Sequence, residues 1–131
     1  SQGQWFVVAT KPRQEYFAGV NLKRQGYRAI LPLIEVSKRR RGKWVEAAEP
    51  LFSGYLFVRL KLGKDNVAPI RSTLGCRDLV RTGSGLVPVP DPVMKTLLSL
   101  NRHQRQVKEV EKVAIAAGAF AGLQGVFKLA K

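Results

Sequence analysis

Side chains able to perform catalysis are few in this sequence, and their spacing suits no common mechanism. The only histidine, His103, lies in a polar segment, where a solvated side chain is the simplest interpretation. The only cysteine, Cys76, has no CxxC partner and no nearby histidine, which argues against zinc binding and thiol catalysis. Glu46 and Glu49 fall on opposite faces of a predicted strand, which does not suit an acid/base pair. No Walker or Rossmann glycine loop is present, so we predict no enzymatic activity and no metal or cofactor.

Basic residues, in contrast, are abundant. The chain of 131 residues has 23 Lys and Arg against 9 Asp and Glu, and its net charge of +14 indicates a polyanionic partner. A membrane surface is the main rival to nucleic acid, but it requires basic charge on one face of an amphipathic helix. The densest cluster, residues 38–43, instead has Gly42 placed for a tight turn, which predicts the tip of a β-hairpin. A solvated loop tip is the simpler interpretation of such a cluster, but four consecutive like charges repel each other, so we favour contact with nucleic acid.

Composition limits the class of protein and the compartment. Hydrophobic residues make up 45% and charged residues 24% of the chain, as in an ordinary globular domain. A single cysteine excludes an internal disulfide and fits a reducing compartment. Because no apolar run approaches the ~20 residues of a membrane span and no signal peptide is visible, we expect a cytoplasmic protein.

The segment 55–62 predicts a strand with two different faces. One face carries Leu56, Val58, Leu60 and Leu62, which suits a core. The opposite face carries two aromatic residues followed by two bases: Tyr55, Phe57, Arg59 and Lys61. Either a helix covers the aromatic end or that end is a docking patch, and the pattern alone favours the helix.

The elements around this strand indicate an α+β domain with a mostly antiparallel sheet. Residues 5–10 predict a buried strand, and Pro12 suits the first turn of a helix that ends at Gly26. The apolar pairs of this helix are Phe17 with Val20 and Ala18 with Leu22. An extended segment over 27–36, interrupted by Pro32, leads to the hairpin.

The second half of the chain predicts shorter elements. Asp65-Asn66 can cap a short helix that ends at Leu74-Gly75, and Leu79-Val80 lies in a strand that the turn at 83–85 closes. Asp91-Pro92 starts another helix, whose apolar stripe is Val93, Met94, Leu97, Leu98 and Leu100. We predict a domain over 1–100, a linker or frayed helix extension over 101–112, and the beginning of a further domain over 113–131.

Several of these stretches together resemble the N-terminal (NGN) domain of the NusG/RfaH family of transcription elongation factors, and the specialised paralog RfaH more than general NusG. The most specific is the Glu-Pro-Leu-Phe…Tyr-Leu-Phe-Val block at 49–58, and the segment 113–126 resembles the KOW motif that opens the C-terminal domain of the family. The remaining matches are Trp5-Phe6-Val7-Val8, Arg41-Gly42-Lys43, Leu79-Val80-Arg81-Thr82-Gly83 and Val87-Pro88-Val89-Pro90.

The resemblance implies an antiparallel sheet flanked by helices and a role in transcription. Family members bind the clamp helices of the largest RNA polymerase subunit through an apolar patch and bridge the cleft around DNA, which suppresses pausing and termination. The residues that match this polymerase-binding patch are Phe52, Tyr55, Phe57, Leu79, Met94 and Leu97. The resemblance therefore favours a docking role for the aromatic face of 55–62, and we expect the protein to act as a monomer.

The resemblance also bears on the basic residues. Lys11 and Arg41 match positions near the exposed non-template DNA strand in RfaH-like factors. Charge alone adds their neighbours to the predicted nucleic-acid-binding set: Arg13, Lys38, Arg39 and Arg40. Such groups neutralise phosphates, so we expect salt-dependent contact with weak sequence specificity.

The chain departs from RfaH at two sets of positions. RfaH has a His-Thr-Thr run that meets the polymerase gate loop, and residues 66–68 are Asn-Val-Ala here. Ala9, Pro12 and Phe17 replace polar or basic residues that help RfaH read its DNA element. These departures argue against sequence-specific recruitment to that element and for a weaker or differently built gate-loop contact.

Two further hypotheses follow from the sequence. In RfaH the C-terminal segment packs as helices over the patch before it refolds into a barrel, and we hypothesise that 113–131 covers the patch around Tyr55 and Phe57. A KOW barrel needs more strands than these residues supply, and a complete one would add the ribosome as a partner. The alternative to an elongation factor is a ribosome- or RNA-binding protein, because high charge and KOW-like segments also occur in ribosomal proteins.

Overall fold

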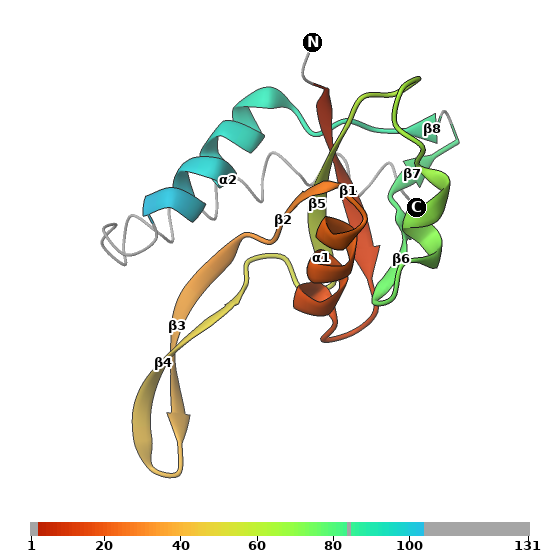
Figure 1. Cartoon of the computed structure of the whole chain (residues 1–131). Helices are drawn as coiled ribbons and strands as arrows, with labels where there is room; N and C mark the ends of the chain where they lie inside the picture. Colours follow the sequence, from red (N-terminus) through yellow and green to blue (C-terminus); the bar gives the residue numbers. More distant parts are fainter. Residues whose placement is uncertain (1–2, 84, 104–131) are drawn as a thin grey trace.

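Apolar and β-branched residues build a four-stranded antiparallel sheet at the centre of the computed structural model, which describes residues 3–83 and 85–103 (Figure 1). In order across the sheet, the strands are β2 (Arg28–Ile30), β5 (Tyr55–Leu60), β1 (Gln4–Thr10) and β6 (Cys76–Leu79). The two central strands pair from Gln4 opposite Leu60 to Ala9 opposite Tyr55. The predicted fold class is thereby confirmed.

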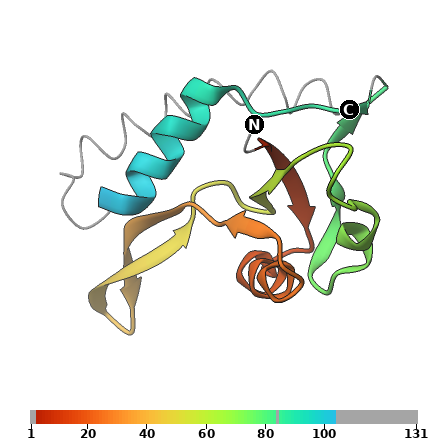
Figure 2. The same ribbon diagram turned by 45° about the horizontal axis from the view of Figure 1, so that its top comes forward.

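Two helices lie on opposite faces of this sheet, as Figure 2 shows with α1 seen end-on. α1 (Glu15–Arg24) packs Ala18 and Leu22 against one face, and α2 (Asp91–His103) packs Met94 and Leu97 against the other. Because side chains alternate along β5, this strand contributes to both layers. Its even-numbered residues contact the layer of α1, whereas Phe57 contacts the layer of α2.

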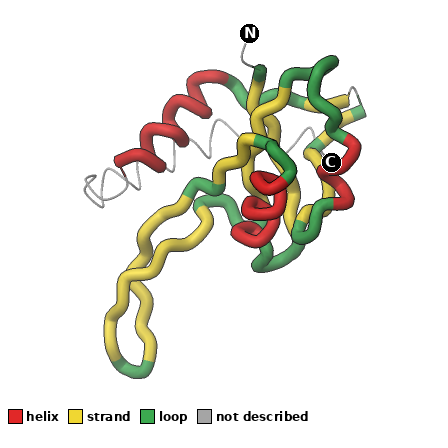
Figure 3. Tube along the Cα trace, viewed as in Figure 1, coloured by secondary structure: helices red, strands yellow, loops and turns green. Residues whose placement is uncertain are grey.

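A long hairpin extends from the body of the domain (Figure 3). Its strands are β3 (Leu33–Arg40) and β4 (Lys43–Pro50), which pair in register along their whole length. The predicted hairpin with Arg41-Gly42 at its tip is therefore confirmed. A second, short hairpin of β7 (Arg81–Thr82) and β8 (Gly85–Leu86) confirms the turn predicted after the strand at Leu79.

The start of α1 differs from the prediction. Pro12 is not in the first helical turn, because the Gln14 N–H donates to the Lys11 carbonyl and closes a separate turn before the helix. Phe17 is also exposed, contrary to the predicted apolar pair with Val20, because the buried side of this short helix runs along Ala18, Gly19 and Leu22.

The end of β5 and the segment that follows differ as well. Leu62 was predicted to belong to the core, but β5 ends at Leu60, so Leu62 is exposed. The short helix is a single 3₁₀ turn, η1 (Ala68–Ser72), and ends before Leu74. Val67 is its N-cap, without a side-chain cap hydrogen bond, so the predicted cap by Asp65-Asn66 is wrong. Asn66 accepts the Ala68 N–H at 3.1 Å, and Asp65 accepts the Lys61 N–H at 2.7 Å.

The second helix confirms the prediction of a start at Asp91-Pro92 and continues to His103, three residues into the predicted linker. Its first turn is anchored by the Pro90 carbonyl, which accepts the N–H groups of Val93 and Met94. The rest of the linker and the KOW-like segment 113–131 lie outside the described residues.

Candidate functional site

Most of the predicted polymerase-binding residues converge on one apolar cluster between the sheet and α2. We define this apolar cluster as Trp5, Val7, Phe52, Phe57, Val80, Val89, Met94 and Leu97. Phe52 and Phe57 meet edge to face within it, with ring centroids 6.0 Å apart and an angle of 74° between the ring planes. Tyr55 packs against the cluster from its edge. Four of the six predicted residues are thus cluster members, and a fifth touches it.

Four of these residues are buried and one is half-buried. The buried ones are Phe52, Phe57, Met94 and Leu97, and the half-buried one is Tyr55. Phe57 and Leu97 are 0% exposed, because α2 covers the aromatic face of β5, so in this conformation they cannot touch a partner. This is the helix cover that the alternating pattern alone favoured. Half-buried apolar side chains surround the covered centre, and we define this rim as Leu51, Tyr55, Val93 and Leu98.

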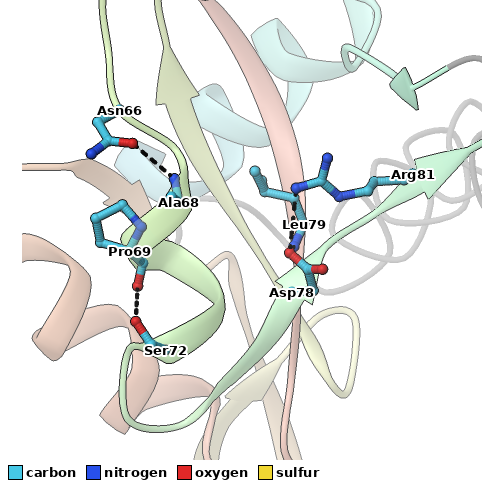
Figure 4. A network of polar contacts seen from close by, with 7 residues as sticks. All are labelled: Asn66, Ala68, Pro69, Ser72, Asp78, Leu79 and Arg81. Atoms are coloured by element: carbon cyan, nitrogen blue, oxygen red, sulfur yellow. Dashed lines mark hydrogen bonds and ion pairs between the residues drawn. The ribbon is translucent and has the colours of Figure 1, made fainter.

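Leu79, the sixth predicted residue, lies on the opposite face of the sheet. It packs with Phe6, Val8 and Leu56 in the layer of α1. Figure 4 shows its neighbours: the Leu79 N–H donates to Asp78 Oδ1 at 2.7 Å, and Arg81 forms an ion pair with the same carboxylate at 3.6 Å. The structure therefore does not bring Leu79 together with the other five residues.

The basic hairpin tip has a turn in which the left-handed backbone is essential. Arg41 and Gly42 have φ of 51° and 78°, and positive φ at both central residues is typical of the type I′ turns that suit two-residue hairpins. The structure leaves Arg39, Arg40 and Arg41 exposed at this tip. Lys38 is half-buried and forms an ion pair with Glu49, so its charge is partly compensated within the hairpin.

The other two predicted nucleic-acid-binding residues lie in the turn before α1, apart from the hairpin tip. Lys11 and Arg13 are both exposed there, and Arg13 has a φ of 62°. Arg13 lines a shallow pocket together with Thr10 and Arg77. The sequence analysis missed Arg77, although its place next to the buried Cys76 on a strand indicates an exposed side chain.

Sequence reasoning also missed Trp44. The structure leaves this indole 71% exposed, opposite Arg39 on the hairpin. A pattern of charges around an isolated aromatic residue is the signal that could have identified it.

The groups that could perform other chemistry are unsuited to it. Cys76 is buried, and desolvation raises the pKa of its thiol from 9.0 to about 11, so the nucleophilic thiolate is scarce at neutral pH. Within the described residues, no group of three or more His, Cys, Asp or Glu side chains could hold a metal ion. None of the helices in that part of the chain has the length and apolar character needed to span a bilayer.

Comparison with known proteins identifies the family of this chain. The family model described as "Transcription termination factor nusG" matches residues 3–98, which include the sheet and most of α2. The chain belongs to the NusG family. The greater resemblance to RfaH and the KOW-like nature of 113–131 stay predictions.

Curated relatives in the NusG family are similar at low identity. NusG of Thermus thermophilus, a transcription termination/antitermination protein, is 26% identical over an alignment that covers 93% of this chain and 79% of the relative. The protein of the same name from Halalkalibacterium halodurans is 24% identical, covering 95% and 80%.

A solved structure supports the fold. A structure titled "Domain interaction in Thermotoga maritima NusG" matches with a TM-score of 0.56 at 23% identity. The match covers 81% of this chain but only 60% of the Thermotoga chain, so the chain spans less than two thirds of the length of that NusG.

Proposed function

We propose that this chain is a cytoplasmic transcription elongation and antitermination factor that binds the clamp helices of the largest RNA polymerase subunit. It contacts nucleic acid near the transcription bubble and suppresses pausing and termination. The observation that carries the proposal is the match to the NusG family over residues 3–98. The geometry supports it, because an apolar surface and a basic projection lie on different parts of one small domain.

The rim of the apolar cluster is the proposed polymerase-binding surface. Leu51, Tyr55, Val93 and Leu98 pack against the buried apolar cluster, and aromatic residues in such positions commonly dominate the energy of protein–protein contacts. In this proposal Phe52, Phe57, Met94 and Leu97 hold the rim in shape rather than touch the polymerase. Leu79 on the other face contributes only to the fold.

The basic hairpin is the proposed nucleic-acid contact. Arg39, Arg40 and Arg41 carry exposed charge at the end of a projection, where they can reach phosphates without a clash from the domain body. Lys11 and Arg13 provide a second basic site before α1. Lys38 contributes less, because its ion pair with Glu49 partly compensates its charge.

Binding of the chain to bacterial core RNA polymerase tests the proposal. We expect Tyr55→Ala to weaken binding at least about tenfold, as loss of an interface anchor does. Tyr16→Ala is the matched control, because Tyr16 is an exposed tyrosine on α1, on the other side of the sheet. If the two variants bind equally well, the rim is not the polymerase-binding surface.

Arg41→Asn tests the hairpin without disturbing its turn. Asn tolerates positive φ, and Asn-Gly is a preferred type I′ sequence, so the substitution removes one charge and keeps the hairpin. We expect weaker binding to single-stranded DNA and a shallower salt dependence, with a slope that falls by about 0.7 for one lost phosphate contact. Absence of polymerase binding, combined with RNA binding that depends on the arginines, would favour the ribosome- or RNA-binding alternative.

We further propose that residues 113–131 cover the rim in the isolated protein. The support is the resemblance of this segment to the KOW motif and the half-buried apolar rim that a cover would protect. Deletion of 104–131 should then raise polymerase affinity and expose the rim to a hydrophobic dye. Unchanged affinity and unchanged dye binding would rule the cover out.

A further inference from the structure

Trp44 occupies an unusual place for a tryptophan. It lies on β4 one residue after the tip turn ends, directly opposite Arg39 on β3, and is 71% exposed. The other tryptophan, Trp5, is 8% exposed in the apolar cluster, with the guanidinium groups of Arg28 and Arg59 at 5.9 and 6.0 Å from its ring. The two tryptophans therefore differ in environment: Trp5 is buried in a core, and Trp44 is exposed outside one.

The Trp44 ring belongs to neither of the two apolar core clusters of the described residues. Among residues 3–83 and 85–103, no ring contact and no side-chain hydrogen bond involves it. Its strand, β4, belongs to the hairpin that projects from the domain body (Figures 1 and 3). A large apolar surface exposed to water costs free energy and is more informative than an exposed small residue. The exposed indole is therefore accessible to a binding partner.

The surroundings of the ring define the chemistry of such a partner. Arg39 lies across the ladder, and Arg40, Arg41 and Lys43 complete the tip, all of them exposed. The nearest acid on the same face, Glu46, accepts a hydrogen bond from the Ser37 hydroxyl at 2.6 Å. The partner must satisfy several cations and a flat aromatic face at once, which suits a polymer that carries phosphates and aromatic bases.

We propose that Trp44 is a base-stacking residue that makes the hairpin a binding site for unpaired nucleotides. The indole stacks on one base, and Arg39 on the facing strand binds the adjacent phosphate. Base faces are open in a single strand and hidden by stacking in a duplex, so the site selects single-stranded nucleic acid. This inference rests on the proposed contact between the hairpin and nucleic acid, and adds to it a component that does not depend on charge.

The first experiment measures the affinity of the whole chain for a fluorescently labelled oligo(dT) over a range of salt concentrations. We expect Trp44→Ala to weaken binding about tenfold, within the range for loss of one base–aromatic stack, with the salt slope unchanged because no charge is lost. Trp44→Phe should recover part of the affinity. Val45→Ala, a half-exposed apolar residue on the opposite face of the same strand, is the matched control and should bind like the original chain.

The second experiment uses the intrinsic fluorescence of the indole. Oligo(dT) should quench the emission of the original chain and leave that of Trp44→Phe unchanged, since the remaining Trp5 is buried. A duplex of mixed sequence should bind the original chain and Trp44→Ala with equal affinity.

The outcomes separate this inference from the proposed function. If Trp44→Ala binds oligo(dT) like the original chain while Arg41→Asn binds less tightly, stacking is wrong and the charge-based contact stands. If neither variant changes binding, both are wrong for this hairpin. If Trp44→Ala weakens only the binding of polymerase in the absence of nucleic acid, the ring contacts protein and the inference is overturned.

Discussion

At the scale of single residues, the two aromatic residues of β5 differ in role. Phe57 supports the fold, and Tyr55 is the residue that we propose for binding. Phe57 is 0% exposed and meets Phe52 edge to face, whereas Tyr55, two positions earlier on the same face, is half-buried at the rim. Their roles differ because Phe57 is a buried member of the apolar cluster, whereas Tyr55 packs against the cluster and stays partly exposed. A substitution at each position should therefore affect different measurements.

We expect Phe57→Ala to lower the free energy of unfolding by about 3–5 kcal/mol, because it empties a closed aromatic site. Tyr55→Ala should cost less than half of that, because its ring is already partly in water. Urea denaturation of both variants measures the difference. Equal losses of stability would contradict the assignment of Tyr55 to a rim.

Cys76 makes a pH-dependent contribution to stability. Burial raises the pKa of its thiol to about 11 in the folded protein, so the folded state holds this proton more tightly than the unfolded state with a pKa near 9.0. The contribution is therefore fully present below pH 9 and is lost as the pH rises towards 11. Between these values, Cys76→Ala should lose stability less steeply than the original chain, as thermal denaturation can measure. Parallel pH profiles of the two proteins would contradict this expectation.

At the scale of elements, glycine turns determine how α1 meets the sheet. Gly75 precedes β6 with a φ of +90°, and a Cβ at this position would lie 2.9 Å from the backbone nitrogen of Ala18. Gly26 ends α1 with a nearly equal φ of +93° and has open space around it. The two positions share the backbone requirement and differ only in the close approach.

Substitution of these two glycines separates the free-energy cost of backbone strain from the cost of a steric contact. Gly26→Ala should cost about 1–2 kcal/mol for a left-handed backbone alone. Gly75→Ala should cost clearly more, because it must also push α1 away from the start of β6. Chemical denaturation of the two variants gives both values. A smaller loss for Gly75→Ala would mean that α1 shifts without resistance.

At the scale of the whole molecule, the apolar rim and the hairpin tip are separate surfaces on one chain. The tip projects from the body, whereas the rim lies between the sheet and α2 (Figures 1 and 2). They share no residue, and energetic effects at distant, independent sites usually add. Their joint action on one assembly would therefore come from simultaneous binding rather than from coupling through the fold.

We expect Tyr55→Ala and Arg41→Asn to have additive effects on affinity for a polymerase complex that contains an open DNA bubble. The loss in the double variant should equal the sum of the single losses to within about 0.5 kcal/mol. On polymerase without nucleic acid, Arg41→Asn should have no effect. A loss in the double variant far from the sum would indicate that the two surfaces communicate.

Much of the local structure of this protein can be predicted from its sequence alone. Alternation along 55–60, the positive φ available to Gly42, and the turn residues around Asp91 depend on neighbouring residues, and the structure confirmed each of these elements. The resemblance to the NusG/RfaH family, most specific at 49–58, was likewise found from the sequence alone. It agrees with the match of the NusG family model.

Which faces are covered could not be predicted from the sequence, because it depends on contacts between distant segments. The burial of Phe57 depends on α2, more than thirty positions later in the chain, and the place of Leu79 depends on how β6 adds to the edge of β1. Trp44 is exposed because its hairpin extends away from every other element that the structure describes. Periodicity defines the two sides of a strand or helix, but contacts between distant segments determine which side meets a partner.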